Sequence, residues 1–148
     1  MNSQSLQADL NDIHNLERFV RAQNPVFERV RTELEQGRKR GHWMWFIFPQ
    51  IKGLGHSDMA TEFAISSREE AEAYLKHSVL GPRLRECSRL VIRVEGHSIE
   101  DIFGYPDNLK FWSSMTLFAQ VTSENQIFKD ALKKYFGGKF DRLTIERL

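Results

Sequence analysis

The stretch GPRLRECSRLVIRVEG, residues 81–96, carries the periodicity that decides the fold. Its apolar positions recur every three to four residues: Leu84, Cys87, Leu90, Val91 and Val94. This spacing places them on one face of an α-helix. Gly81-Pro82 precedes the pattern as a helix breaker, and Gly96 stands where a helix commonly ends. The stretch therefore predicts one amphipathic helix between two interruptions.

Similar signals predict helices on both sides of this stretch. A first amphipathic helix is expected over Leu10–Val20, and Asn24-Pro25 should end it and cap the next one, which runs to Gly37. Capping boxes begin two more helices, because Ser67 and Ser123 are each followed three residues later by Glu or Gln. The remaining segments with helix signals are 57–63, 98–104, 106–119 and the tail from residue 141.

Strict alternation of apolar and polar residues is scarce, which argues against a large sheet. The sequence thus predicts an all-α, compact single domain over residues 1–148, with about six to eight short helices and a disordered tail at residues 1–9. An irregular aromatic segment lies at its centre. There Trp43–Phe48 fits either a buried strand or a buried helical turn, Pro49 ends it, and Gly53–Gly55 allows a loop.

Composition excludes several classes of protein. Lys plus Arg number 21 against 20 Asp plus Glu, so the chain has no general basic field for nucleic acid. The polar N-terminus shows no secretory signal, and no apolar run is long enough to span a membrane. A single cysteine, Cys87, suits a reducing compartment. We therefore expect a soluble, cytoplasmic protein with no membrane partner.

Motifs for metals and cofactors are missing from the sequence. The five histidines lack the spacing of a zinc site, and Cys87 lies on an apolar helix face with no activating neighbour, as a structural cysteine would. Gly53-Leu54-Gly55 lacks the third glycine of a dinucleotide-binding loop. We expect neither a metal nor a cofactor.

The stretch RKRGHWMWFIFPQIKGLGHS, residues 38–57, is the strongest candidate site. Its simplest interpretation is a core plug of aromatic rings beside a solvated basic turn. The functional interpretation is that alternate residues face opposite ways and some line a cavity. Two sets of candidates follow: His42, Trp43, Trp45 and Gln50 for a ligand, and Arg38, Lys39 and Arg40 for an anion. Stacking of a nucleic-acid base on Trp43 or Trp45 is a third interpretation.

A second constellation lies between residues 107 and 118. Asp107, Lys110 and Ser114 share one face of the predicted helix, and Ser113 and Thr116 add hydroxyl groups to an apolar element. The simplest interpretation is local, with hydroxyls bonded to carbonyls of the preceding turn and an ordinary Asp–Lys pair. Alternatively, Lys110, Ser114 and Thr116 contribute to a ligand site.

Three classes of function therefore stay open. The first is a small-ligand-binding domain, enzymatic or not, with a pocket between His42–Gln50 and Asp107–Thr116. The second is a single-stranded nucleic-acid binder that uses Arg38–Arg40 with Trp43 or Trp45, which the charge balance disfavours. The third is a protein-interaction module. For the first class we predict that His42, Gln50, Lys110 and Ser114 line one concavity walled by Trp43 or Trp45, because buried polar groups need partners. The sequence decides neither the ligand, nor a reaction, nor the oligomeric state.

The chain also resembles the bacterial family known as domain of unknown function 1810, whose members are often labelled calpastatin. The resemblance covers residues 18–148 and rests on the following residues: Arg18-Phe19, Ala22-Gln23, His42–Gln50, Gly53–Gly55, Ser57, Glu70-Ala71, Tyr74-Leu75, Leu80-Gly81, Arg83-Leu84, Phe103-Gly104, Asp107, Lys110, Ser114–Phe118, Asp141 and Thr144. Gly41 departs from the small hydroxyl residue expected there. The resemblance implies a mainly helical fold and no established activity, and the calpastatin label implies nothing, because repeated inhibitor segments are absent.

Overall fold

The computed structural model describes residues 12–148, which form ten helices and no strand. The helices are α2 (Glu17–Gln23), α3 (Phe27–Glu35), α4 (Met44–Ile47), α5 (Asp58–Glu62), α6 (Arg68–Lys76), α7 (Leu80–Arg93), α8 (Ile99–Phe103), α9 (Asp107–Gln120), α10 (Gln126–Phe136) and α11 (Arg142–Arg147). The predicted all-α fold is confirmed. The predicted tail at residues 1–9, and Leu10 of the first predicted helix, lie outside the described residues.

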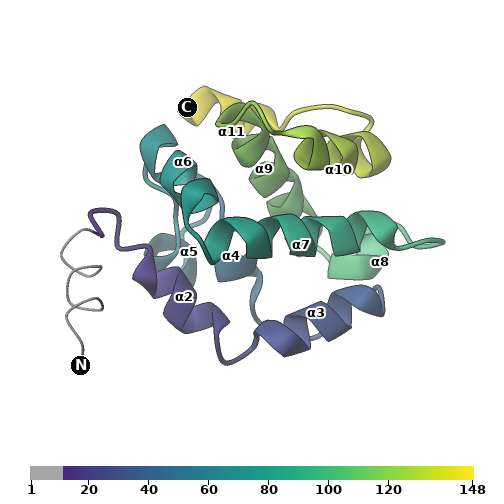
Figure 1. Ribbon diagram of the computed structural model, residues 1–148. Coiled ribbons are helices and arrows are strands. Elements are labelled where there is room, and N and C mark those ends of the chain that lie inside the picture. Colours follow the sequence, from purple (N-terminus) through teal and green to yellow (C-terminus); the bar gives the residue numbers. More distant parts are fainter. Residues whose placement is uncertain (1–11) are drawn as a thin grey trace.

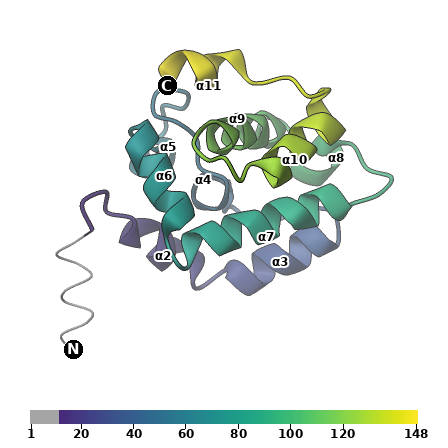
Figure 2. The same ribbon diagram turned by 45° about the horizontal axis from the view of Figure 1, so that its top comes forward.

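Helix α9 is the centre of the fold. Figure 2 looks nearly along its axis, and α8, α10 and α11 lie around it. Seven consecutive residues, Ser113–Ala119, are buried, which requires neighbours on every side of the helix. The sequence meets that requirement with apolar residues around most of the circumference and with hydroxyl residues at the remaining positions.

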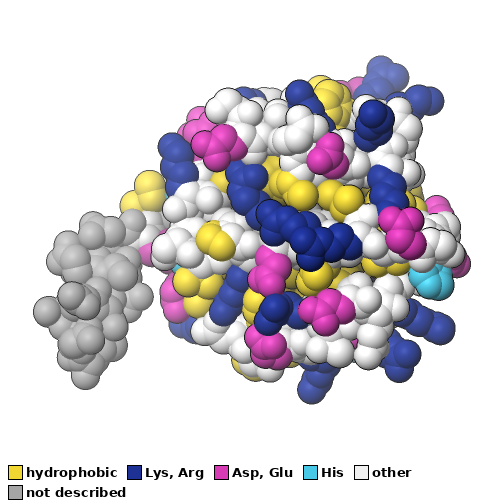
Figure 3. All heavy atoms as spheres, turned by 45° about the vertical axis from the view of Figure 1, so that its right-hand side comes forward, with side chains coloured by type: hydrophobic (Ala, Val, Ile, Leu, Met, Phe, Trp, Pro, Cys, Tyr) yellow, Lys and Arg dark blue, Asp and Glu magenta, His cyan; other side chains and the backbone are white. Residues whose placement is uncertain are grey.

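Helix α7 crosses the molecule and packs against α3, α6 and α10 (Figure 1). Its apolar stripe is buried as the periodicity predicts, while two of its arginines lie over aromatic rings of the neighbouring helices. The Arg83 guanidinium lies 4.6 Å from the centroid of the Phe27 ring, and the Arg85 guanidinium lies 5.1 Å from that of Phe128. Figure 3 shows Lys and Arg side chains lying across apolar surface on one face of the molecule, with acidic side chains among them. These stems cover apolar atoms while the charges stay in water.

The ambiguous segment at the centre of the chain is a helical turn. Met44–Ile47 forms α4, closed by a hydrogen bond from the Phe48 N–H to the Met44 carbonyl. The Phe48 ring then meets Phe103 and Phe111 edge to face, with centroids 5.8 and 5.0 Å apart. Ile51 forms an isolated parallel bridge with a residue just before α6. The aromatic run therefore anchors α4 in the core against α8 and α9.

Two predicted helix starts are wrong. Ile13 is exposed and lies before α2, which begins only at Glu17. Asn24 caps the end of α2 and does not begin the next helix, while Pro25 lies in the turn before α3. The physical reason is that the Val26 N–H donates to the Gln23 carbonyl and closes a turn there, so α3 begins only after this turn.

The capping signals are confirmed in part. Ser57 caps α5, and Ser98 forms a complete capping box at α8. Ser67 caps α6, but the Glu70 carboxylate binds Ser66 and not the Ser67 N–H, so only half of that box forms. The prediction of a capping box at Ser123 is wrong, because α10 begins at Gln126 and has no side-chain cap.

Candidate functional site

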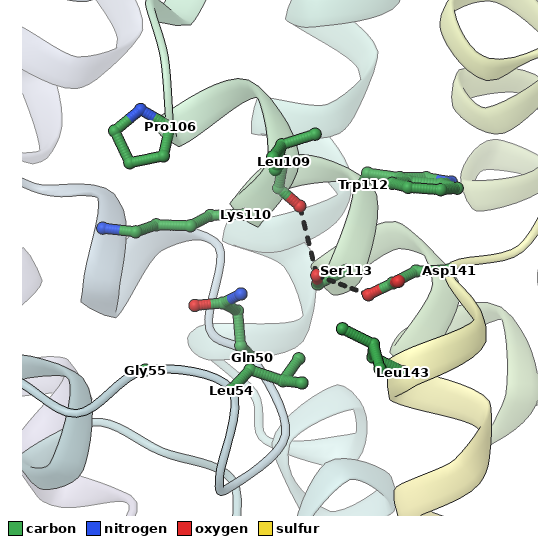
Figure 4. Close-up of a pocket in the computed structure, with 10 residues that line it drawn as sticks. All are labelled: Gln50, Leu54, Gly55, Pro106, Leu109, Lys110, Trp112, Ser113, Asp141 and Leu143. Carbon is green, nitrogen blue, oxygen red and sulfur yellow. Dashed lines mark hydrogen bonds between the residues drawn. The ribbon is translucent and has the colours of Figure 1, made fainter.

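A cavity of about 360 Å³ opens between the segment after α4, the first half of α9 and the start of α11 (Figure 4). Three distant parts of the chain meet here, which is common for a binding site. The residues that line it are Gln50, Leu54, Gly55, Pro106, Leu109, Lys110, Trp112, Ser113, Asp141 and Leu143.

Asp141 supplies an oriented carboxylate to this cavity. It stands at the start of α11 and is only 7% exposed. Its Oδ2 accepts hydrogen bonds from the hydroxyls of Ser113 and Thr144, each at 2.7 Å, and its backbone N–H donates to the Thr116 hydroxyl at 2.9 Å. Among residues 12–148, no hydrogen bond reaches the other oxygen, Oδ1. The carboxylate is thus fixed through one oxygen, and the second stays available.

Ser113 links α9 to that carboxylate. Its hydroxyl lies 3.1 Å from the Leu109 carbonyl of the preceding turn and 2.7 Å from Asp141 Oδ2. A hydroxyl has one proton, and a charged acceptor at the shorter distance makes the stronger bond. Ser113 therefore donates to Asp141. The simplest interpretation, a hydroxyl bonded only to a carbonyl of the preceding turn, accounts for only part of its contacts.

Lys110 brings positive charge to the same cavity. Its ammonium lies 3.4 Å from Asp107 Oδ1 and 5.2 Å from the centre of the Trp45 ring. Asp107 is shared, because Lys39 approaches its Oδ2 more closely, at 2.9 Å. Two ammonium groups therefore share the Asp107 carboxylate, and Lys110 makes the longer of the two contacts.

Apolar side chains form the walls. Leu54, Leu109 and Leu143 border the opening, and Trp112 is held in place by stacking on Phe136 at an interplanar angle of 15°. The Trp112 indole N–H also donates to a backbone carbonyl at 2.8 Å. Figure 4 shows the Gln50 carboxamide within this frame, with no hydrogen bond to the other lining residues drawn.

The structure brings together only two of the four residues predicted to share a concavity. Gln50 and Lys110 line the cavity, whereas His42 is exposed and lies outside it. Ser114 is fully buried on another side of α9 and does not line the cavity either. Thr116, also buried, contributes indirectly by holding the Asp141 backbone. The roles of these residues in binding a ligand stay predictions.

The structure covers Trp43, one of the two rings predicted to stack on a base, whereas Trp45 is half-buried under the Lys110 ammonium and its stacking stays a prediction. Trp43 is 2% exposed and donates its indole N–H to Glu33 at 3.0 Å, so its faces are covered by protein. The neighbouring cations diverge. Arg38 and Arg40 are exposed and border a separate hollow that also contains acidic residues, while Lys39 turns inward to Asp107. The three cations therefore do not form one anion site.

Glu33 holds this segment in place. Its Oε1 accepts the backbone N–H groups of Arg40 and Gly41, at 2.6 and 2.9 Å, together with the indole of Trp43. Burial raises the pKa of the Glu33 carboxyl, but the three donors and Lys39 together lower it by more than burial raises it. The pKa therefore lies below the ordinary value of 4.5.

The lowered pKa of Glu33 gives a prediction with a definite sign. A carboxyl whose pKa is lower in the folded protein stabilises the fold above its unfolded pKa, and this contribution is lost as pH falls through the folded value. Glu33→Gln should therefore lower the free energy of unfolding by about 1–2 kcal/mol at pH 7, because a charged acceptor is replaced by a neutral one. Urea unfolding at pH 7 and pH 3.5 measures this. A difference that does not shrink at pH 3.5 would contradict the assignment.

Ser114 gives a second prediction. Its hydroxyl is buried and has no hydrogen-bond partner within residues 12–148. An unpaired buried hydroxyl is unfavourable, and alanine is the better helix former. Ser114→Ala should therefore raise the free energy of unfolding by about 1 kcal/mol. Ser113→Ala is the matched control and should lower it, because Asp141 loses a donor. A less stable Ser114→Ala protein would show that this hydroxyl has a partner.

Sequence reasoning missed most of the cavity. Asp141 and Ser113 are 28 residues apart in the chain, and the apolar wall residues carry no chemical signal of their own. The available signal was the pair of hydroxyls at Ser113 and Thr116, which share a helix face, together with Asp141 and Thr144 in the family resemblance. These residues form the hydrogen-bonded group described above.

Other kinds of site find no support in the described part of the chain. Residues 12–148 contain no cluster of three or more His, Cys, Asp or Glu side chains that could hold a metal ion. No helix within them is long and apolar enough to cross a membrane. Cys87 is buried, and burial raises the pKa of its thiol to about 12, so it is not an activated nucleophile.

Comparison with known proteins identifies the family. Residues 13–148 match the family described as "Protein of unknown function (DUF1810)". The chain belongs to this family. A similar solved structure is that of the conserved hypothetical protein Rv1873 from Mycobacterium tuberculosis, with 60% sequence identity and a TM-score of 0.90. The match covers 90% of this chain and 96% of that one. No curated protein matches the chain. The family resemblance is confirmed, and the function has to be argued from the cavity.

Proposed function

We propose that this member of the DUF1810 family binds a small organic molecule in the cavity between α9, α11 and the segment that follows α4. The observation that supports the proposal best is the Asp141 carboxylate, buried at an apolar cavity and fixed through one oxygen. A buried charge is unfavourable unless it is paired. Two hydroxyls orient this carboxylate without neutralising it, so a ligand with a hydrogen-bond donor would complete its coordination.

The shape and lining of the cavity support a ligand of metabolite size. Small-molecule pockets usually measure about 300–1,000 Å³ and combine apolar walls with a few polar groups. This cavity, at about 360 Å³, falls at the small end of that range. Its polar groups come from four residues on three segments, Gln50, Lys110, Ser113 and Asp141, and they are set among leucines and a tryptophan.

Asp141→Asn tests the proposal. The asparagine carbonyl can still accept from Ser113 and Thr144, so the fold should be retained. An NH₂ group replaces the available oxygen, so a ligand donor would meet another donor instead of an acceptor. A metabolite collection would be screened by thermal unfolding. A ligand present at a hundred times its Kd stabilises the folded state by about 2.7 kcal/mol, enough for a clear rise in Tm.

The expected result is a metabolite that raises the Tm of the unmodified protein and binds at least about tenfold more weakly to Asp141→Asn, a loss of about 1.4 kcal/mol. Asp130→Asn, an exposed change on α10, is the matched control and should bind normally. If every stabilising metabolite acts equally on the protein and on Asp141→Asn, the cavity is not the binding site and the proposal fails.

A further inference from the structure

We infer, on the basis of the proposed function, that the ligand is amphoteric: it carries a nitrogen donor or ammonium group at one end and an anionic group at the other, joined by an apolar body. The cavity has charges of opposite sign on two different segments of its lining. Asp141 lies at the start of α11, and Lys110 is the fourth residue of α9. Each end of the ligand is assigned from the contacts that these two residues already make.

The Asp141 end selects a donor. Its Oδ2 already accepts two hydroxyl groups, and Oδ1 accepts none from residues 12–148. A carboxylate only accepts hydrogen bonds, so a ligand atom placed at Oδ1 has to carry a hydrogen. An ammonium or another N–H group fits best, because it also compensates the buried negative charge.

The Lys110 end selects an anion. Asp107 is the carboxylate nearest to Lys110, but it makes its shorter contact, 2.9 against 3.4 Å, with the more deeply buried Lys39. Lys110 therefore makes only the longer, weaker contact with this carboxylate. The Trp45 ring under its ammonium fixes the position of the charge without neutralising it. A carboxylate or similar anion from the ligand would complete this pairing, with the Gln50 carboxamide as a neighbouring polar contact.

The space between the two ends is apolar. Figure 4 shows the Lys110 amine pointing away from Asp141, with Gln50 lying between the two and Leu54 and Leu143 bordering the opening. Leu109 and Trp112 complete the wall on the side of α9. A hydrocarbon or aromatic body would remove this surface from water, while its two polar ends meet the two charges. A ligand with only one charged end would leave either Asp141 without a donor at Oδ1 or Lys110 with Asp107 alone.

Matched probes test this assignment. The rigid set is 4-(aminomethyl)benzoate, 4-methylbenzylamine and 4-methylbenzoate, which share a ring and differ only in their charged ends. The flexible set is 6-aminohexanoate, hexylamine and hexanoate. Its alkyl chain lets the distance between the charged ends vary, so the result does not depend on the distance that the ring fixes. Affinities would be measured by titration, with changes in the amide NMR signals locating each probe on the full chain.

The expected result is that the amphoteric member of at least one set binds at least tenfold more tightly than both of its one-ended partners. Asp141→Asn should weaken the amphoteric probe and the amine but leave the acid unchanged. Lys110→Met should weaken the amphoteric probe and the acid but leave the amine unchanged. The comparison of probes on the unmodified protein does not depend on how well either variant folds.

Two kinds of failure are distinguishable. The ligand class is wrong, and the binding site stands, if a one-ended probe binds as tightly as the amphoteric one in both sets. The same conclusion follows if no probe binds and a screened metabolite that depends on Asp141 lacks one of the charged ends. If neither probes nor metabolites perturb the cavity, the proposed function itself is overturned.

Discussion

Replacing Gly81 by alanine is expected to lower the free energy of unfolding by about 3 kcal/mol or more, the upper end of the overpacking range. A Cβ atom at this position would lie 2.1 Å from the Leu75 carbonyl oxygen and 2.9 Å from its carbonyl carbon. Both are backbone atoms at the end of α6, so no side-chain rotation can relieve the contact. The helices α6 and α7 would have to move apart, which disturbs the buried Tyr74 and Leu84 on their facing sides.

The measurement is urea unfolding of Gly81→Ala beside Gly138→Ala. Gly138 has a left-handed backbone, with φ +77°, but open space around its missing Cβ. Its replacement should cost only about 1–2 kcal/mol, the backbone strain of a side chain in that conformation. Gly81 does not have a positive φ, so a loss at Gly81 larger than this strain would come from the steric contact. Equal losses of stability would show that α6 and α7 can separate easily, contrary to the packing described above.

Gly81 also shows which kind of feature cannot be predicted from the sequence. Gly81-Pro82 looks like an interruption before a helix, yet both residues lie in the first turn of α7, which begins at Leu80. Proline is compatible with a first turn, where the N–H groups have no partner within the helix. The glycine serves a different purpose, since it allows α6 to approach closely. That purpose depends on a contact between two helices, which periodicity along one helix cannot reveal.

The candidate site was predictable to a similar extent. Gln50 and Lys110 were found because polar residues in apolar surroundings are visible in the sequence. His42 was misplaced because the hypothesis assumed that alternate residues face opposite ways, as in a strand, whereas Met44–Ile47 is a helical turn. Asp141 was missed because it follows an irregular glycine-containing loop and becomes significant only when α11 packs against α9. Local pattern therefore identified one wall of the cavity, and tertiary packing supplied the other.

Removal of the Arg18 side chain should have an effect as large as the change at Gly81. The Arg18 guanidinium has five N–H groups, and all five donate to acceptors within 2.9 Å. The acceptors are the Glu70 carboxylate and the backbone carbonyls of His14, Asn15, Glu62 and Ala64. This one side chain therefore joins the start of α2 to the end of α5, to the segment that follows it and to α6.

Arg18→Met should lower the free energy of unfolding by about 3–5 kcal/mol, because it leaves the Glu70 carboxylate without its cation in a buried position. Arg18→Lys should recover little of this, since an ammonium has three donors and cannot span the same acceptors. As a control, Arg142→Met removes an exposed pair with Glu146 and should change stability by no more than about 0.5 kcal/mol.

A double-mutant cycle decides whether the buried pair itself causes the loss. Replacing both Arg18 and Glu70 by methionine removes the unpaired charge, so the double variant should be less destabilised than the sum of the two single changes. Urea unfolding of the four proteins gives the coupling energy directly. Strict additivity would mean that the backbone carbonyls, and not the Glu70 carboxylate, account for the effect of Arg18, because those carbonyls lose their donor in every variant that lacks the arginine.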